Sequence, residues 1–388
     1  MSLFTHLLLP FTVAFFVVLW IFPKVLAVAL QKNIVDNPDA RKLQKRPIPV
    51  LGGMAVFFGL TFGFVIAMIF ADCADLFPVF AAMTIMLYVG TLDDIMGLSP
   101  SLRFLVEIAV MTMMVVISRC AINDFHGLFG IHEISIWVAV PLTVFATVGI
   151  INAINLIDGV DGLSSGYCVM ACLMFCLMFY QVGHESMVIL SAVAAGAMIP
   201  FFFHNVFGQT SKMFIGDGGT LVMGTMMATF VLQVLDAQSP CVGLCSSNVG
   251  LIPFTLAVLS IPVFDTLRVM LSRIARGVSP FAADKTHLHH IFIEMGCSHP
   301  ATFVAILTLN SMVVLAWWWL VEAGYSVDVQ LYVVIALALF FTFGLYGLFS
   351  YHIARQTRFS KLLYRFGKAS HLERKGVFLW LREMVDKI

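Results

Sequence analysis

The chain has 388 residues, of which 60% are hydrophobic and 11% are charged, and its 22 basic residues balance 22 acidic ones. A mean hydropathy of +0.97 excludes a water-soluble globular domain. A formal net charge of zero gives no global field that would attract nucleic acid.

Apolar stretches long enough to cross a bilayer recur along the whole chain. Each should be a helix, because lipid offers no partner for unpaired backbone groups. We predict an all-α, polytopic membrane protein with about eleven spans, at residues 3–22, 48–70, 77–92, 102–118, 136–156, 165–182, 186–206, 216–235, 249–272, 301–321 and 330–353.

The basic residues predict the orientation of these spans. All but one of the 22 Lys and Arg residues fall in the odd-numbered connections, their flanks or the tail, and the exception is Arg119. Because cytoplasmic loops carry the excess of Lys and Arg, we expect the N-terminus outside and the C-terminus in the cytoplasm.

The cysteines and the tail bear less directly on chemistry. Cys168, Cys172 and Cys176 form one helix stripe typical of packing, and a disulfide among the cysteines of the outer side stays open. Residues 354–388 alternate apolar side chains with cations, which predicts a basic amphipathic tail at the membrane surface.

Asp93 and Asp94 are adjacent carboxylates at the inner end of the third span. Because they repel each other, both stay ionised near neutral pH only beside a cation, and hard oxygen ligands without Cys suit Mg²⁺. A solvated helix end is the alternative.

The segment NAINLIDGVDGL carries Asn and Asp at intervals of three residues, which places neighbouring members on one helix face. They are Asn152, Asn155, Asp158 and Asp161. Four such residues in an otherwise apolar region favour a functional site over the alternative, a polar helix end that is capped by Asn or Asp.

The segment KMFIGDGGT runs from Lys212 to Thr220. A glycine-rich turn that opens a helix exposes amides to anions, so we expect an anion-binding turn here, with a tight turn capped by Asp217 as the alternative. No GK[ST] follows the glycines, so this is not a Walker A loop.

His287, His289 and His290 lie in the longest inner loop, near Arg273, Arg276 and Lys285. Three His could bind zinc, although no fourth ligand is evident, and the neighbouring cations favour a role in holding phosphate oxygens. The first inner loop adds further cations, which are also explained as determinants of topology.

Together these features predict a site at the cytoplasmic face that combines carboxylates for Mg²⁺, an anion turn and a basic His loop. Such a set suits phosphoryl transfer, in which catalysis is mostly positioning and charge neutralisation. A site embedded among membrane helices suits an acceptor with a lipid tail.

The motifs LDDIMGL, NAINLIDGVDGL, FIGDGGT and HLHH stand in the order seen in polyprenyl-phosphate N-acetylhexosamine-1-phosphate transferases. The chain resembles this family from Asp36 to His290, and its HxHH form is similar to the WecA-like branch, the undecaprenyl-phosphate GlcNAc-1-phosphate transferases, which use UDP-GlcNAc. The branch that transfers phospho-MurNAc-pentapeptide typically has three consecutive His.

The resemblance implies an enzyme of the inner membrane, with residues 1–353 as one transmembrane catalytic domain. Polyprenyl phosphate would attack the β-phosphate of a UDP-N-acetylhexosamine to give polyprenyl-diphospho-HexNAc and UMP, the first step of a lipid-linked cell-surface glycan. The implied partners are these two substrates and membrane lipid, without nucleic acid, and a homodimer stays open.

The resemblance also implies roles for individual residues. The candidates are catalytic Asp93, Asp94 and Asp158; substrate-binding Asn152, Asp161, Lys212, Phe214, Arg276, His287, His289 and His290; and metal-binding Asp217 and Asn155. Asp93 would be the base for the lipid phosphate, Asp217 would ligate Mg²⁺ or Mn²⁺, and Phe214 would stack on uracil.

Two departures and two alternatives complete the prediction. Gln44 replaces a His that is usual in the family, and Thr220 replaces a Ser while keeping the hydroxyl. A covalent phospho-aspartyl route is an alternative mechanism. A secondary transporter is an alternative function, although its polar residues should lie near the bilayer midplane.

Overall fold

The computed structural model describes residues 3–38, 46–281, 284–374 and 376–387. Its first half contains η1 (Phe4–Leu8), α1 (Leu9–Gln31), β1 (Val35–Asp36), β2 (Ile48–Pro49), α2 (Gly52–Ala67), η2 (Ala74–Leu76), α3 (Phe77–Met96), α4 (Pro100–Ser118), η3 (Leu128–Gly130), α5 (Ile136–Leu156), α6 (Leu163–Gln181) and α7 (Glu185–Phe207). Its second half contains α8 (Gly216–Leu235), η4 (Pro240–Ser247), α9 (Leu251–Val258), α10 (Ser260–Ala275), α11 (Leu288–Glu294), α12 (His299–Glu322), α13 (Val327–Leu339), η5 (Phe340–Gly344), α14 (Leu345–Ala354), α15 (Arg358–Ala369), η6 (Leu372–Arg374) and α16 (Gly376–Val385).

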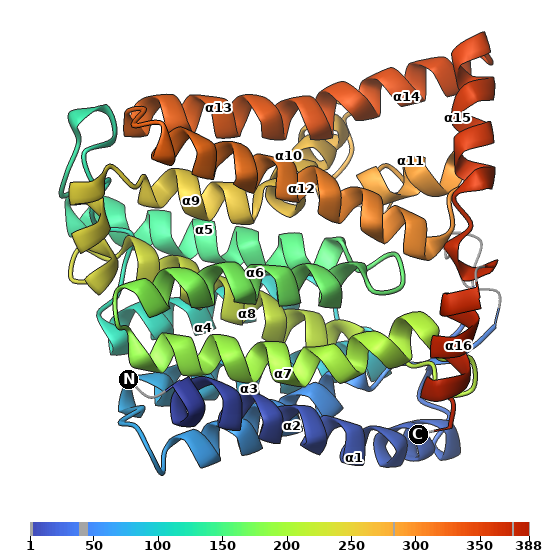
Figure 1. Ribbon diagram of the computed structural model, residues 1–388, viewed down its shortest axis with the longest axis horizontal. Helices are drawn as coiled ribbons and strands as arrows, with labels where there is room; N and C mark the ends of the chain where they lie inside the picture. Colours follow the sequence, from blue (N-terminus) through green and yellow to red (C-terminus); the bar gives the residue numbers. More distant parts are fainter. Residues whose placement is uncertain (1–2, 39–45, 282–283, 375, 388) are drawn as a thin grey trace.

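Most of the long helices run side by side in one bundle (Figure 1). Among the described residues, nine helices are long and apolar enough to cross a membrane, and these coincide with nine of the eleven predicted spans. The predicted span at 48–70 is the shorter α2, of 16 residues. The all-α, multi-pass prediction is confirmed, with β1 and β2 forming a single two-stranded antiparallel pair.

The predicted span at 249–272 is wrong as one continuous helix, because it breaks at Leu259 into α9 and α10. Pro262 has no N–H to donate to the carbonyl of Val258, four residues earlier. That carbonyl instead accepts hydrogen bonds from the hydroxyl of Tyr167 and from Asn310 Nδ2. Asn310 Oδ1 also accepts from the amide of Ile261 at 3.1 Å. Buried polar side chains therefore satisfy the backbone groups that the break frees.

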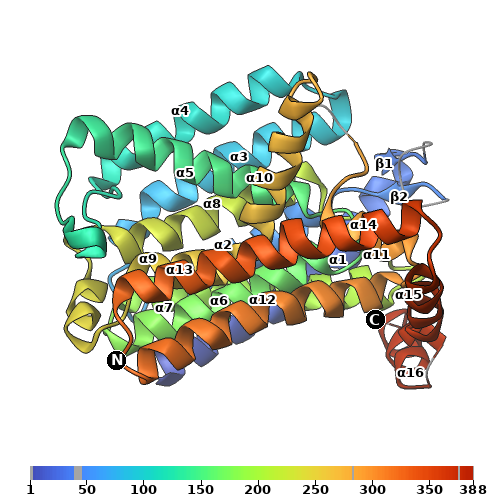
Figure 2. The same cartoon turned by 90° about the horizontal axis from the view of Figure 1, so that it is seen from above.

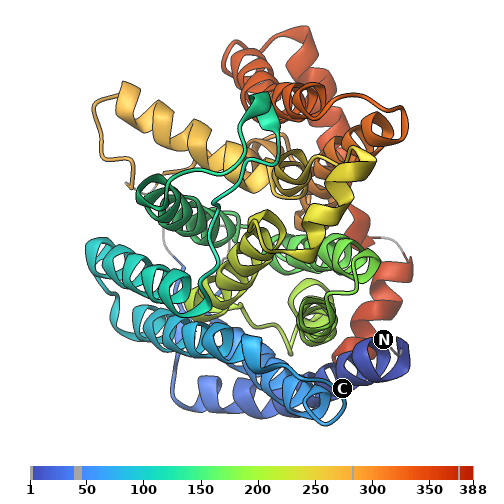
Figure 3. The same ribbon diagram turned by 90° about the vertical axis from the view of Figure 1, so that its left-hand side faces the viewer.

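The break changes the direction of the chain. Beyond it, α10 leaves the axis of α9 and leans toward α4 (Figure 2). Viewed from the end of the bundle, α10 projects away from the other helices (Figure 3). An apolar cavity lies beside the break, between α4, α5, α9 and α10.

Helix α8 lies at the centre of the bundle (Figure 3). Within its most apolar stretch of 18 residues, 94% is buried inside the protein. Glycines allow the backbones of α2 and α3 to approach its first turn. A Cβ on Gly53 would overlap the backbone of Gly219, and a Cβ on Gly90 would overlap that of Gly218. The glycines of the FIGDGGT motif thus pack three helices together at one end.

The two termini lie at opposite ends of the bundle (Figure 2). The end that holds the C-terminus also holds β1, β2 and α11, and there α15 and α16 lie across the ends of the bundle helices (Figure 1). The predicted tail is therefore helical in the structure. The eight cysteines are free.

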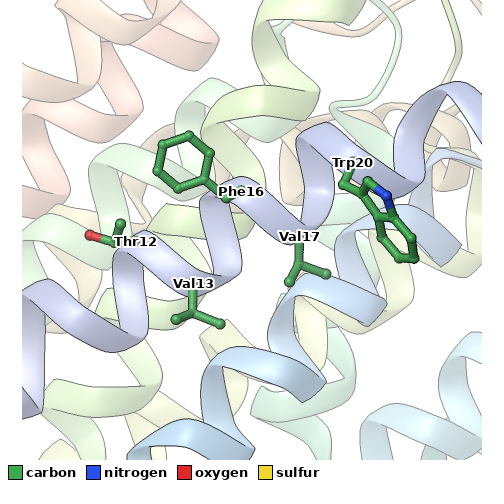
Figure 4. Close-up of a pocket in the computed structure, with 5 residues that line it drawn as sticks. All are labelled: Thr12, Val13, Phe16, Val17 and Trp20. Carbon is green, nitrogen blue, oxygen red and sulfur yellow. The ribbon is translucent and has the colours of Figure 1, made fainter.

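A shallow groove on α1 is lined by Thr12, Val13, Phe16, Val17 and Trp20 (Figure 4). Phe16 and Trp20 are more than 60% exposed. Because the groove has no charged group to orient a ligand, we interpret it as lipid-facing surface.

Asn310→Ala should destabilise the protein by about 2–4 kcal/mol, because it leaves several buried backbone and hydroxyl groups at the break without partners. Thermal unfolding of the purified protein in detergent measures the loss. The matched control is Thr308→Ala on the same helix, where an exposed hydroxyl donates to the carbonyl of Val304. Equal melting temperatures for the two variants would contradict this account of the break.

Candidate functional site

The carboxylate of Asp94 caps the first turn of α8. Asp94 Oδ1 accepts from the amide of Asp217 at 2.9 Å, and Oδ2 accepts from the amide of Gly218 at 3.2 Å. A carboxylate at this position also interacts favourably with the helix dipole. These two amides are therefore occupied by protein, and the anion-binding turn expected from the glycine motif is not formed by them.

Gly216 makes this approach possible. Its φ is +72°, and an added Cβ would lie 2.5 Å from Asp94 Oδ2 and 2.6 Å from the carbonyl oxygen of Val50. Both its conformation and its surroundings therefore require glycine.

Strand β2 and the start of α2 hold the segment before α8 from the other side. The amide of Phe214 donates to the carbonyl of Pro49 at 2.8 Å, and the amide of Gly52 donates to the carbonyl of Phe214 at 2.9 Å. These two hydrogen bonds join the segment before α8 to β2 and to the first residue of α2. Gln44 lies outside the described residues.

Asp93 and Asp217 share one cation, Arg103. Its Nη1 lies 3.1 Å from Asp93 Oδ2 and 3.6 Å from Asp217 Oδ2. Asp93 Oδ1 accepts from the amide of Leu98 at 2.7 Å. Sequence reasoning counted Arg103 only as a determinant of topology and missed its place between two candidate carboxylates.

Asn155 bonds to two side chains near the start of α8, Asp217 and Thr220. Its Nδ2 donates to Asp217 Oδ1 at 2.6 Å and to the hydroxyl of Thr220 at 2.7 Å. The side-chain amide of an Asn is assigned from such contacts, and a flip would turn its oxygen toward the same carboxylate. Thr220, which keeps the hydroxyl of the Ser usual at this position, thus accepts a hydrogen bond from Asn155.

These groups surround one polar cavity of 410 Å³. Its lining residues are Val35, Asp36, Val50, Asp93, Asp94, Gly97, Asn155, Asp158, Phe214, Gly216 and Asp217. The structure therefore brings together both predicted metal residues, all three predicted catalytic residues and the predicted uracil-stacking Phe214. Asp158 also accepts from the hydroxyl of Ser164 at 2.5 Å.

Asn152 turns away from this cavity. Its Nδ2 donates to the carboxylate of Glu107, a fully buried residue on α4, and to the carbonyl of Val148. Glu107 Oε1 lies 3.6 Å from Arg103 Nε. Sequence reasoning missed Glu107, although a lone carboxylate inside an apolar span was a signal for it.

Asp161 and Lys212 form an ion pair beside the cavity, with 2.6 Å between Asp161 Oδ2 and Lys212 Nζ. His299 Nδ1 lies 2.8 Å from the same oxygen and is another residue that sequence reasoning missed. Burial raises the pKa of Asp161, but His299 and Lys212 outweigh it and lower the pKa below its usual value. Lys212 Nζ also lies 5.9 Å from the ring centroid of Phe214.

The His loop is anchored by a buried acid that the sequence did not single out. Asp265 pairs with Arg268 at 2.7 Å, and its Oδ2 lies 3.0 Å from His287 Nδ1. The other ring nitrogen of His287 is buried without a hydrogen-bond partner among the described residues. An unpartnered polar atom at this position indicates a ligand or water contact.

His289 and His290 follow on α11. The ring of His289 packs against Gly159, where any Cβ would overlap it, so this loop contacts the Asn/Asp turn directly. Burial and the neighbouring His290 and His287 lower the pKa of His289 well below its usual value, and burial lowers that of His290 to about 4. Both rings are therefore neutral near pH 7 and can donate hydrogen bonds without carrying charge.

Arg276 is half exposed and pairs with Asp284 at 3.0 Å, as does the buried Arg273. It does not line the polar cavity. Burial raises the pKa of Asp284, but hydrogen bonds from Arg273, Thr286 and Arg276 lower it far below its usual range. The structure thus places Arg276 at the edge of the His loop.

The donor set around Asp217 fits Mg²⁺ chemically, because it consists of carboxylate and amide oxygens. Among the described residues, no three Asp, Glu, His or Cys side chains are grouped closely enough to bind an ion by themselves. Mg²⁺ usually keeps several waters and binds through one or two carboxylates and substrate phosphates. Asp217, with Asp93 nearby, suits that mode.

Comparisons with known proteins identify a family and several relatives of the chain. Residues 76–235 match the family described as Glycosyl transferase family 4. The chain is 30% identical over 306 residues to "Probable undecaprenyl-phosphate N-acetylglucosaminyl 1-phosphate transferase" of Bacillus subtilis (strain 168), covering 79% of this chain and 82% of that protein. It is 28% identical over 321 residues to "Undecaprenyl-phosphate alpha-N-acetylglucosaminyl 1-phosphate transferase" of Escherichia coli (strain K12), covering 82% and 84%.

Gly216→Ala should lower the melting temperature more than Gly183→Ala does. Both glycines have positive φ, near +71°, but a Cβ on Gly183 meets nothing within 4 Å. Positive φ costs an L-residue about 1–2 kcal/mol in either variant. The overlap with Asp94 adds to that cost at Gly216 alone, so equal melting temperatures would contradict the close approach.

Proposed function

The chain belongs to glycosyl transferase family 4, and from that premise we propose that it transfers GlcNAc-1-phosphate from UDP-GlcNAc to polyprenyl phosphate. The products are polyprenyl-diphospho-GlcNAc and UMP. One observation carries the proposal: Asp93, Asp94, Asp158, Asn155 and Asp217 converge on one cavity together with Phe214.

We assign the donor to Phe214, which lines this cavity, and to the polar groups near it. Phe214 offers an aromatic face for uracil, and Lys212 beside it offers a cation for phosphate. Asp161 holds Lys212 in place and is ionised near neutral pH. Neutral His289 and His290 donate hydrogen bonds to the sugar and diphosphate.

We assign the acceptor chain to a second cavity, which is apolar and has a volume of 850 Å³. It lies between α4, α5, α9 and α10, beside the break at Leu259, and exposed Phe145 and Leu267 are among its lining residues. Asn152 lines this cavity, and Asn155, three residues later on α5, lines the polar one. A polyprenyl chain in the apolar cavity would therefore bring its phosphate to Arg103 and Asp93.

The reaction joins a phosphate oxygen of the lipid to the β-phosphorus of the donor. The bond from that phosphorus to the bridging oxygen breaks, and UMP leaves with this oxygen. A phosphate monoester has a second pKa near 6, so the acceptor is mostly dianionic at pH 7. Asp93 is bonded to Arg103 and to the amide of Leu98. We therefore assign it to positioning rather than to obligatory proton abstraction.

Mg²⁺, or Mn²⁺ in its place, would bind at Asp217 with support from Asn155. The ion would neutralise the charge of the donor diphosphate. Arg103 already supplies one positive charge between Asp93 and Asp217. Asp94 contributes indirectly, because it caps the helix that begins with the Asp217 turn.

The chain is a multi-pass membrane protein, and we assign the end that holds α15 and α16 to the cytoplasm. The site, the His loop and the basic tail share this end, where a nucleotide-sugar is available. Labelling of a cysteine introduced beside His290 by an impermeant reagent in intact cells would contradict this orientation.

Two alternatives are less well supported. Another UDP-HexNAc, or UDP-MurNAc-pentapeptide, would undergo the same chemistry, since small changes in a sugar alter binding only modestly. A secondary transporter would need its polar site near the midplane. Asn310 and Tyr167, which are buried within the bundle, bond instead to the backbone at the helix break.

Purified protein should release UMP from UDP-GlcNAc only when undecaprenyl phosphate and Mg²⁺ are both present. A coupled assay of UMP detects the release, and mass analysis of the lipid product identifies the sugar from a panel of UDP-sugars. UMP formation without the lipid would contradict transfer to it, and a product mass other than GlcNAc would replace the donor named here.

Asp217→Asn should reduce turnover by roughly two to four orders of magnitude at ordinary Mg²⁺, because it removes one ligand and leaves donor charge uncompensated. Asp328→Asn is the matched control, since this carboxylate bonds to the amide of Phe129 at the opposite end of the bundle. Near-normal turnover of Asp217→Asn would refute the metal assignment.

Direct attack and a covalent phospho-aspartyl route at Asp93 or Asp158 make different predictions without lipid. With polyprenyl phosphate rigorously absent, direct attack allows no exchange of label between UMP and UDP-GlcNAc. A covalent intermediate would allow it. Robust exchange, followed by chromatography of the nucleotides, would show that the single displacement proposed here is wrong.

A further inference from the structure

The C-terminal tail returns to the loop that carries Lys212. Helix α16 lies beside the end of α7 (Figure 1), where the ring centroids of Phe378 and Phe207 are 4.7 Å apart. Phe378 and Val385 are buried, so α16 is packed against the bundle along its length. This contact brings the last described residues of the chain next to the segment that leaves α7.

Asp386 accepts hydrogen bonds from three consecutive amides of that segment. Its Oδ1 lies 2.9 Å from the amide of Gln209, 3.2 Å from that of Thr210 and 3.2 Å from that of Ser211. The hydroxyl of Ser211 donates to the same oxygen at 3.0 Å. Partial burial raises the pKa of Asp386, but these bonds outweigh it and lower the pKa below its usual value.

Ser211 is held from the bundle side as well. Its Oγ lies 3.1 Å from Nδ1 of His204, a buried residue of α7 whose ring stacks on Phe22 with 4.2 Å between centroids. Ser211 thus sits between a ring fixed in the transmembrane core and a carboxylate of the tail.

The residues that follow Ser211 are the ones that face the donor. Lys212 pairs with Asp161, and the carbonyl of Met213 accepts from Asn205 Nδ2 at 3.0 Å. The amide of Phe214 is bonded to Pro49. Asn205 and Pro49 therefore hold the middle of the loop, and the start of the loop is held by Asp386 and His204.

We propose that Asp386 is a positioning residue for the donor: the tail fixes residues 209–211 and so orients Lys212 and Phe214 toward the nucleotide. This inference rests on the proposed use of a UDP-sugar at that loop. The tail is then part of the donor site, in addition to lying at the membrane surface.

Two measurements on the full-length enzyme test the proposal, with Asp386→Ala, Asp386→Asn and, as matched control, Glu383→Ala. Glu383 has the same charge, lies in the last turn of α16 three residues before Asp386, and is exposed. Hydrogen exchange followed by mass spectrometry should show faster exchange at residues 209–211 in Asp386→Ala, because the amides lose their acceptor. The KM for UDP-GlcNAc should rise roughly tenfold, with kcat and the KM for undecaprenyl phosphate changed far less. Asp386→Asn keeps one acceptor oxygen and should fall between Asp386→Ala and the wild type.

The outcomes separate the inference from its premise. Unchanged exchange at 209–211 would overturn the clamp, and faster exchange with an unchanged donor KM would overturn the positioning role. A fall in kcat proportional to the loss of folded protein, with KM unchanged, would indicate a purely structural contact and would also overturn it. If wild-type protein released no UMP from any UDP-sugar, the proposed function would fail, while the exchange result would still report on the clamp.

Discussion

The hydrogen bonds from the first turn of α8 to Asp94 are the interaction on which the site depends. They join α3 to the central helix of the bundle at the point where both reach the same end. Because Gly216 has positive φ and lies against Asp94, the chain turns sharply into α8 and directs Asp217 into the polar cavity. Without this junction, Asp93 and Asp217 would have no common partner in Arg103.

The same junction explains why the two adjacent acids, Asp93 and Asp94, have different hydrogen-bond partners. Both carboxylate oxygens of Asp94 accept hydrogen bonds from backbone amides, whereas Asp93 bonds to Arg103 and to the amide of Leu98. A pair of acids that looks equivalent in sequence is thus divided by the helices on either side. The division follows from geometry, since neighbouring residues at a helix end point in different directions.

Much of the fold and of the candidate site could be predicted from the sequence. Membrane helices are recognised by the length of their apolar stretches, and polar clusters stand out against an apolar background. The fold class and the convergence of Asp93, Asn155 and Asp217 followed from that contrast. The break at Leu259 did not, since Pro23, Pro141 and Pro200 lie inside helices that continue past them. Whether a proline breaks a helix depends on partners such as Asn310, which are distant in the sequence.

The residues that sequence reasoning missed share a physical cause. Arg103, Glu107, Asp265 and His299 are single polar residues within or beside apolar helices, and only the packing reveals their partners. Asn152 shows the converse, because its spacing placed it with Asn155, yet its side chain bonds to Glu107.

The placement of Asn152 and Asn155 on one helix also connects the two cavities. They are three residues apart on α5, which separates their side chains by less than one turn, and each lines a different cavity. An enzyme that joins a water-soluble donor to a lipid must keep the two in separate environments until their phosphates meet. Here a single turn of α5, faced by Arg103 and Glu107 of α4, forms the boundary between those environments. In the proposed reaction, the chemistry would be confined to this end of the bundle, and the apolar cavity would hold the acceptor chain.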